Sequence, residues 1–300
     1  MKKLLTLLFC CFILTVHTQS FFTKDTVFNA KRTAWLSASI TTGWVSSTIG
    51  LQTTWYKDNW THFHFFDDSK QWLGMDKLGH IYTSNAIVKN ISSLYTWAGV
   101  NKNTSLAIGS GVAFGFLTTL EVLDGFSDKW GFSWSDVGAN ALGIAWYVWQ
   151  DLLWEEQRLK LKFSAYPSKY ARYRPNTLGN NFSERILKDY NGQTYWLSVS
   201  PSTFMNKNSS FPKWLSISFG YSVDQKLHGD LNHYTIIENG KQLEFNAQSQ
   251  FLLSLDIDLE KINTNKKWLS TLFKALNHIK IPFPALILTG NKLEAHPFYF

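Results

Sequence analysis

Cysteine is almost absent from this 300-residue chain, and its two copies, Cys10 and Cys11, both lie close to the N-terminus. A chain cleaved after residue 20 therefore has no disulfide, no thiol nucleophile and no thiolate metal ligand. Charged residues are also scarce, at 17% of the chain against about 25% in an average soluble domain. Because hydrophobic residues reach 45%, the chain can bury a sizeable core, which excludes a disordered protein.

Familiar catalytic and nucleic-acid signatures are missing as well. The sequence has no phosphate-binding loop, no GxSxG nucleophile elbow and no HExxH zinc helix. It has no arginine-rich cluster and no recognition-helix pattern, so a nucleic-acid partner is not predicted. No internal repeat and no cofactor-binding motif is visible, and the residues leave open whether a metal is bound.

Aromatic residues, by contrast, are abundant. They make up 16% of the chain, with 14 Trp, 12 Tyr and 23 Phe. Trp and Tyr suit positions where one end of the ring is apolar and the other is wet, as at a membrane interface. The chain length predicts one large domain or two modest ones.

The first twenty residues have the pattern of a secretory signal peptide. Lys2 and Lys3 precede an apolar run over 4–16, and the small residues Thr18 and Ser20 favour cleavage after Ser20. An uncleaved anchor helix is the alternative, although the run is short for a membrane span. We therefore expect an exported protein of the cell envelope, at the outer membrane or in the periplasm.

A lipid anchor is not predicted, because a lipoprotein signal needs a small residue before the modified cysteine and Phe9 precedes Cys10. Removal of residues 1–20 leaves 27 basic against 22 acidic residues, a net charge of +5. This mild positive excess suits an anionic lipid surface.

Residues 21–158 are predicted to form a helical domain. Helices are expected over 75–99, 104–123 and 133–157, and the last begins with a capping box that runs from Ser133 to an aspartate three residues later. Glycine and alanine recur inside these helices, and tryptophan gathers at the end of the last one. This composition is typical of a tightly packed bundle, either embedded in a membrane or forming a soluble core.

Two features of the helical region carry further expectations. The uncharged stretch 36–56 is long enough to cross a bilayer, and a buried helical hairpin is the alternative. Gly111 and Gly115 form a GxxxG pattern, which predicts that two helix backbones approach closely at that point.

The C-terminal half of the chain has a different sequence pattern. Residues 159–194 are predicted to be a basic, tyrosine-rich connector, suited to a phosphate-headgroup surface or to an ordinary solvated linker. From 195–300 the apolar pattern changes to period two, which predicts a β-rich region and makes the fold class α+β. The expected elements are strands over 196–200, 214–221, 251–259, 285–289 and 293–300 and a helix over 268–278.

The end of the chain adds two expectations. Pro297 cannot donate to a strand ladder, so the last strand is predicted to lie at a sheet edge. The final aromatic residues, Phe298, Tyr299 and Phe300, resemble the terminal aromatic of outer-membrane β-proteins.

Polar residues inside the apolar helices offer the only chemistry in the sequence. Because a polar group in an apolar bundle is costly without a partner, we expect these residues to meet one another. Three carboxylates and a histidine could bind a divalent cation or hold a proton for acid–base catalysis. The alternative is a hydrogen-bonded network that only fixes helix register. The candidate catalytic residues are Asp76, His80, Glu121 and Asp136, and the other motif positions are Lys77, Asp124 and Asn140.

The order of these residues resembles a known family. The segments Asp76-Lys77-Leu-Gly-His80, Glu121-Val-Leu-Asp124 and Asp136-Val-Gly-Ala-Asn140 are similar to the YfiM-like family of predicted periplasmic lipoproteins, and more distantly to VanZ-like membrane proteins. The resemblance covers about residues 74–155 and implies an envelope location without an activity. The family's lipoprotein cysteine has no counterpart here, and the β-rich half lies outside the shared motif.

Three functions are compatible with these observations. The first is a non-enzymatic structural or assembly component of the cell envelope, with membrane lipid or an outer-membrane protein complex as partner. The second is a metal-assisted or acid–base hydrolase that acts on a lipid or a cell-wall precursor. The third is a small transporter or channel lined by the carboxylates.

Overall fold

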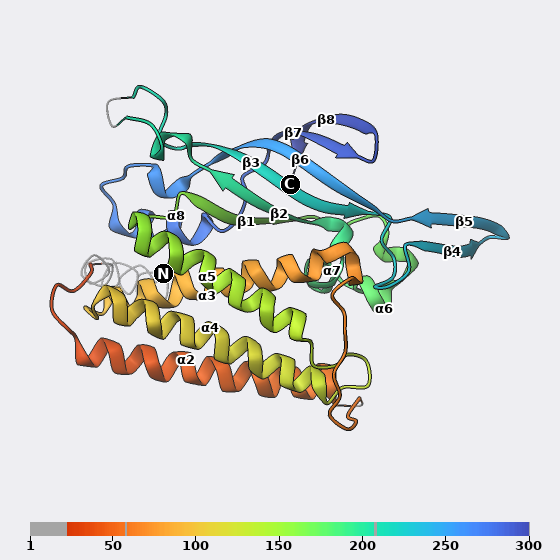
Figure 1. Cartoon of the computed structure of the whole chain (residues 1–300), viewed down its shortest axis with the longest axis horizontal. Helices are drawn as coiled ribbons and strands as arrows, with labels where there is room; N and C mark the ends of the chain where they lie inside the picture. The colour runs from red at the N-terminus through yellow and green to blue at the C-terminus, as the bar shows by residue number, and fades with distance from the viewer. Residues whose placement is uncertain (1–22, 58, 207–208, 300) are drawn as a thin grey trace, which may run out of the picture.

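The computed structural model describes residues 23–57, 59–206 and 209–299, so the predicted signal peptide and Phe300 lie outside the described residues. Four long helices come first and an antiparallel sheet follows, which confirms the predicted α+β class (Figure 1). The long helices are α2 (Ala30–Leu51), α3 (Met75–Trp97), α4 (Lys102–Gly125) and α5 (Trp134–Trp154).

Six strands form one antiparallel sheet in the order β1-β2-β3-β6-β7-β8, so β8 lies at an edge, as Pro297 predicts. A separate hairpin, β4 with β5, projects from one end of the molecule (Figure 1). The strands are β1 (Leu159–Ala165), β2 (Gln193–Val199), β3 (Leu215–Asp224), β4 (His233–Glu238), β5 (Lys241–Asn246), β6 (Gln248–Ile257), β7 (Phe283–Thr289) and β8 (Lys292–Tyr299). Between them lie the helices α6 (Pro175–Leu178), α7 (Phe182–Lys188) and α8 (Lys267–Leu276).

Side-chain caps fix where three of the long helices begin. Ser133 Oγ accepts a hydrogen bond from the backbone N–H of Asp136 at 3.1 Å, which confirms Ser133 as the N-cap of α5, the first half of the predicted capping box. Asn101 caps α4 and Asn29 caps α2 in the same way. Each cap of this kind stabilises its helix by about 1 kcal/mol, because it satisfies a backbone N–H that has no partner inside the helix.

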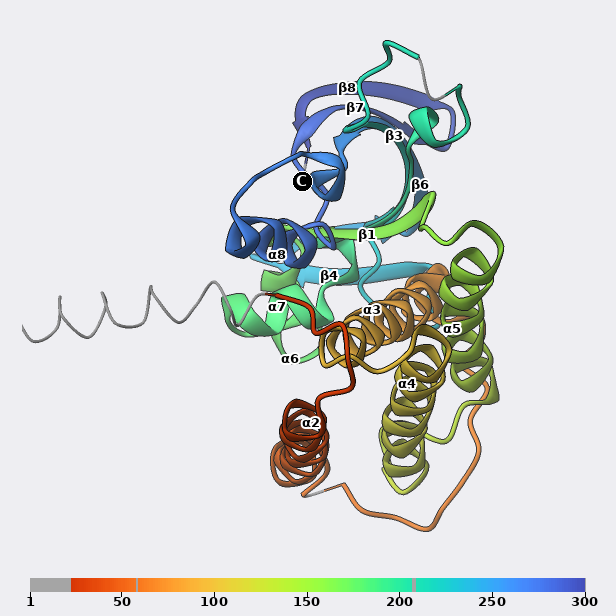
Figure 2. The same cartoon turned by 90° about the vertical axis from the view of Figure 1, so that its left-hand side faces the viewer.

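Helix α3 is the central element, with α4 and α5 packed against it and β1 and β2 on another side (Figures 1 and 2). Two glycines allow α5 and α4 to approach α3 closely. A Cβ added at Gly143 of α5 would lie 2.1 Å from the carbonyl oxygen of Ile81 on α3, and one added at Gly109 of α4 would lie 2.9 Å from the carbonyl oxygen of Val88 on α3. The predicted GxxxG contact is wrong. An added Cβ at Gly111 would meet nothing within 4 Å, and Gly115 faces the ring of a tryptophan instead of a helix backbone.

The uncharged stretch 36–56 forms one continuous helix, α2, followed by a π-helical turn over Gln52–Tyr56, so the alternative of a helical hairpin is wrong. No residue of α2 is buried. Among the helices of the described residues, α4 alone is long and apolar enough to cross a membrane by length and composition.

The segment predicted to be a basic connector contains strand β1. Lys160 and Lys162 on this strand are buried, and their ammonium groups lie 2.7 Å from carboxylate oxygens of Asp258 and Asp256 respectively. The expectation that these two lysines face headgroups or solvent is therefore wrong. Their charges lie inside the molecule and tie β1 to β6 and to the residues that follow it.

The six-stranded sheet carries many polar residues on its buried face, beside an apolar cluster around Trp196 and Leu252, and large apolar residues on its exposed face. On β3, Ser218 is completely buried whereas its neighbour Phe219 is 53% exposed. On β6, Asp256 is completely buried whereas Leu255 is 44% exposed. Figure 2 shows that the sheet curves, with α8 and the segment after it on the inner side. The curve thus encloses the polar face and turns the apolar face outward.

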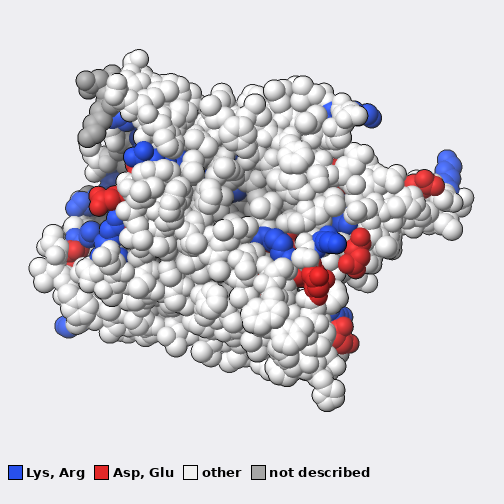
Figure 3. Space-filling view, viewed as in Figure 1, with Lys and Arg blue, Asp and Glu red and all other residues white. Residues whose placement is uncertain are grey.

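On the face shown in Figure 3, charged residues occupy limited areas. Lys, Arg, Asp and Glu gather near α8, around α6 and α7 and at the tip of the β4–β5 hairpin, and wide areas over the sheet and the outer helices are uncharged. The apolar face of the sheet is therefore continuous with a surface that carries few charges.

Candidate functional site

The predicted polar residues converge at one end of the helical layer. Asp76 and His80 lie in the first turns of α3, Glu121 lies in the last turns of α4, and Asp136 and Asn140 lie at the start of α5. The spacing of four residues places each helix's pair on one face. Because α4 and α5 both pack against α3, these faces meet, and the side chains come within hydrogen-bonding or ion-pairing distance.

Lys77 is the positive centre of this cluster. Its Nζ lies 2.6 Å from Asp136 Oδ1, 2.6 Å from Asp68 Oδ1 and 3.0 Å from Asp76 Oδ2. Asp68 also accepts hydrogen bonds from the hydroxyls of Ser133 and a neighbouring serine. Sequence reasoning missed Asp68, because it belongs to the irregular segment before α3 and shares no helical spacing with the others.

His80 lies on the other side of Asp136. Its Nε2 is 3.4 Å from Asp136 Oδ1, and its Nδ1 is 3.1 Å from Asn140 Oδ1 and 3.7 Å from Glu121 Oε1. With the amide oxygen of Asn140 facing the ring, this contact is made when Nδ1 of His80 carries a proton and donates. The other ring nitrogen, Nε2, then faces Asp136.

Two tyrosine hydroxyls close the cluster. Tyr190, from the segment between α7 and β2, donates to Asp76 Oδ1 at 2.7 Å. Tyr56, from the turn after α2, donates to Asp124 Oδ1 at 2.6 Å. The first contact joins the C-terminal half to the cluster and has no signal in the sequence, because the two residues are 114 positions apart.

The start of α3 is held in a strained backbone conformation. Trp72 and Leu73 adopt left-handed φ angles of 53° each, just before Gly74 at φ 80°. A non-glycine residue in this region costs of order 1–3 kcal/mol and persists only where surrounding contacts impose it. Here Tyr221 of β3 donates to the carbonyl of Leu73 at 2.7 Å, and the N–H of Trp72 donates to the carbonyl of Gly229 at 2.9 Å. The β-rich half therefore fixes the direction in which α3 presents its polar residues.

Burial raises the pKa of three carboxyl groups in the cluster. It raises the pKa of Glu121 to about 9, with the nearby charges of Asp136 and Asp124 acting in the same direction. The pKa of Asp136 rises to about 7, through burial and the charge of Asp76, and that of Asp124 rises to about 6, mainly through burial. Glu121 is therefore protonated at neutral pH, and Asp136 titrates near it.

Two other carboxyl groups that contact Lys77, those of Asp68 and Asp76, have lowered pKa values. Burial would raise the pKa of Asp68, but hydrogen bonds from Lys77 and Ser133 lower it to about 2. Burial also opposes ionisation of Asp76, yet the charges of His80 and Lys77 hold its pKa below the usual value. The cluster thus combines ionised carboxylates around Lys77 with a protonated carboxyl beside His80, a pattern that can store or pass a proton.

Asp76, His80 and Asp136 are the residues that could hold a metal ion, because each offers a ligand atom and these atoms lie within 4.8 Å of one another. Glu121 and Asn140 both contact His80 and border this group. Carboxylate oxygen with imidazole nitrogen is a donor set that first-row divalent metals accept.

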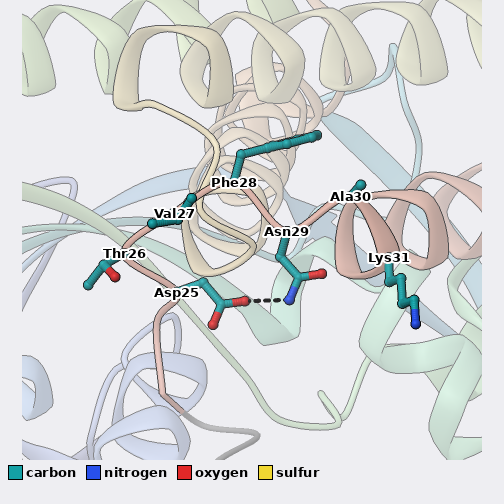
Figure 4. A pocket seen from close by; sticks show the side chains of 7 residues that line it. All are labelled: Asp25, Thr26, Val27, Phe28, Asn29, Ala30 and Lys31. Carbon is teal, nitrogen blue, oxygen red and sulfur yellow. Dashed lines mark hydrogen bonds between the residues drawn. The ribbon is translucent and has the colours of Figure 1, made fainter.

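Two hollows of the described structure lie away from the cluster. One of about 410 Å³ lies at the start of α2, at the opposite end of α3 from the cluster, and is lined by the continuous segment 25–31. Figure 4 shows its side chains pointing in different directions, with a hydrogen bond between Asp25 and Asn29 and no convergent catalytic group. A second, of about 230 Å³, is a mainly apolar groove between α3 and the sheet, lined by Ile81 and Leu197 among others.

The segment that carries the cluster is similar to a known family. Residues 63–150 match the model of a family described as Predicted periplasmic lipoprotein (DUF2279), which confirms the resemblance seen in the motif. The match covers less than a third of the chain and contains every predicted motif residue. The description implies export to the cell envelope and names no activity. No curated protein and no solved structure shows significant similarity to the chain.

Proposed function

We propose that this protein is a non-enzymatic structural or assembly component of the cell envelope, associated with the outer membrane, whose outward apolar face lies in lipid. The observation that carries the proposal is the polarity of the sheet: its buried face combines serine, aspartate and lysine with one apolar cluster, and its exposed face carries leucine, isoleucine and phenylalanine. A sheet in water has the opposite arrangement, with its apolar face on the core.

The exposed apolar residues form one continuous face. Ladder pairing places Phe219 beside Leu253, and Leu253 beside Leu286 on the next strand. Large exposed patches of this kind mark interaction or membrane surfaces, because monomeric soluble proteins rarely carry more than a few hundred Å² of contiguous apolar surface. The exposed members on β3, β6, β7 and β8 are Ile217, Phe219, Phe251, Leu253, Leu255, Leu286, Leu288 and Leu293.

The dimensions favour insertion into one side of a membrane. Along β6 the outward residues from Phe251 to Ile257 cover about 20 Å at ~3.3 Å per residue, less than the apolar band of about 25 Å in closed transmembrane sheets. In the described chain β1 and β8 share no ladder, and the outer edge of β1 is covered only at Phe163, which is bridged to the segment after α8. The sheet therefore keeps unpaired edge groups, which are costly in the middle of a bilayer. Exposed Trp149, Leu152 and Leu153 of α5 extend the apolar surface beside the sheet.

The partner we expect is membrane lipid, and an outer-membrane protein complex is the other candidate. The family description supports an envelope location.

Vesicle flotation tests this proposal. The purified chain should float with phospholipid vesicles after a high-salt wash, and in cells it should sediment with the outer membrane in a density gradient. The double variant Phe219→Asn/Leu253→Asn should float much less, because it places two amides in lipid at paired positions. Ile237→Asn, on the β4 hairpin and 77% exposed, is the matched control and should float like the parent. A monomeric chain that needs no detergent and does not float would refute the proposal.

An acid–base hydrolase acting on a lipid or cell-wall precursor is a second candidate function. The observation in its favour is the contact between His80 and two carboxyl groups of raised pKa, Glu121 and Asp136. Under this alternative, His80→Ala and Asp136→Ala leave stability nearly unchanged and abolish release of product from isolated envelopes. If the cluster is structural, each variant lowers thermal stability, and the double variant loses less than the sum because the residues are in contact.

A further inference from the structure

The polar cluster holds more acidic than basic groups. Its only cationic side chains in the described structure are Lys77 and, when protonated, His80. Buried charge of one sign is costly unless a counter-charge or protons balance it. The acidic members are Asp68, Asp76, Glu121, Asp124 and Asp136.

The geometry matches a cation site built on two helices. Asp76 and His80 come from successive turns of α3, and Asp136 comes from α5. Their ligand atoms lie within 4.8 Å of one another. A first-row divalent metal binds carboxylate oxygen and imidazole nitrogen at about 2.0–2.2 Å, so its ligand atoms lie up to ~4.4 Å apart. Shifts of a few tenths of an ångström would therefore complete the coordination.

Asn140 provides an independent indication of a ligand. Its side chain is completely buried, and its Nδ2 has no hydrogen-bond partner in the described structure. Buried polar groups almost always have a partner, so this donor is one that a bound oxygen, such as a water on a metal, would satisfy. The Oδ1 of the same amide contacts Nδ1 of His80, which leaves Nε2 facing Asp136. A metal-binding histidine is commonly oriented in this way, through its other ring nitrogen.

We propose that Asp76, His80 and Asp136 bind one divalent first-row transition metal ion, such as Mn²⁺ or Zn²⁺, and that the ammonium group of Lys77 competes with it. Lys77 Nζ contacts Asp76 Oδ2 and Asp136 Oδ1, two of the atoms available to the metal. Asp68, 2.6 Å from the same ammonium, holds Lys77 when the metal displaces it. The mixed oxygen and nitrogen donors favour these ions over Ca²⁺ and Mg²⁺, which prefer oxygen alone.

Titration of the full-length, chelator-treated protein with Mn²⁺, Zn²⁺ and Ca²⁺ tests this site, with calorimetry for affinity and elemental analysis for stoichiometry. We expect one equivalent of Mn²⁺ or Zn²⁺ and no binding of Ca²⁺ at the same concentration. His80→Ala and Asp136→Asn should each lose binding at least about a hundredfold, as expected for removal of a ligand. The exposed residues His62 and Asp128 provide matched controls, and His62→Ala and Asp128→Asn should bind like the parent.

Lys77→Met separates the metal site from a purely structural network. Without the competing ammonium, the variant should bind the metal at least roughly tenfold more tightly, because a positive charge leaves two ligand carboxylates. Circular dichroism confirms that each variant is folded, and a metal-dependent rise in the parent's thermal midpoint provides a second readout. Absence of stoichiometric binding, or binding unchanged in both ligand variants, would overturn the proposal. Vesicle flotation does not depend on the metal, so the two proposals fail separately.

Discussion

The buried ion pair of Lys162 and Asp256 offers a way to measure how much the polar interior of the sheet contributes to the free energy of unfolding. Lys162 Nζ lies 2.7 Å from Asp256 Oδ2, and their side chains are 1% and 0% exposed. In Lys162→Met the carboxylate keeps hydrogen bonds from the hydroxyl of Ser198 and the N–H of Ile281, but loses its ion-pair partner. Breaking a buried pair on one side costs about 3–5 kcal/mol, since a charge remains buried without compensation.

The assay is unfolding by urea and by heat in detergent, followed by tryptophan fluorescence. The expected loss corresponds to a fall of roughly 6–20 °C in the thermal midpoint for a chain of this size. Lys188→Met is the matched control: its pair with Glu184 is about one-third exposed on both sides, so the loss should stay below about 1 kcal/mol. Equal effects of the two substitutions would refute the reasoning, because the interior of the sheet would then be as solvated as the surface.

Two further predictions concern packing and pH. Gly143→Ala should lower the free energy of unfolding by about 1–3 kcal/mol or more, because the new methyl group would clash with the carbonyl of Ile81. Gly111→Ala is the control and should be neutral or stabilising, because an added Cβ there has open space around it. Equal thermal midpoints of the two variants would contradict the close contact at Gly143. Burial lowers the pKa of His278 from 6.5 to about 4, so its contribution to stability is complete above pH 6.5 and is lost as the pH falls toward 4. His278→Gln should therefore lose less stability than the parent between pH 6.5 and 4 in urea titrations, and parallel curves would exclude this histidine as the cause.

The period of the apolar residues predicted the elements of the fold but not the orientation of the sheet. Alternation along β3 and β6 identifies both as strands and says nothing about which face is buried. The usual assumption, that leucine points inward, fails at Leu253 and Leu255, which are exposed while Ser254 between them is buried. The β4–β5 hairpin was also missed, although Asn239 and Gly240 give a turn signal between its strands.

The part of the candidate site that lies on helices was predicted from the spacing of its residues. His80, Asp136 and Asn140 were found because i, i+4 pairs on packed helices must face each other. Asp68 and Tyr190 were missed because they reach the cluster from irregular segments, and only tertiary structure brings such segments together. The close helix contact at Gly143 was missed for the same reason. It depends on where α5 crosses α3, which a GxxxG pattern in the sequence does not specify.

The inverted polarity of the sheet also bears on how the chain reaches its native state. In water, collapse is driven by burial of leucine and phenylalanine, so a nascent sheet of this sequence would turn Phe219 and Leu255 toward each other and leave its serines outside. If the exposed face lies in lipid, as proposed, the native orientation becomes favourable when lipid covers those side chains. The sheet would then fold as it enters the membrane, and a chain released into aqueous buffer is expected to aggregate through the exposed strands before Lys162 and Asp256 can pair.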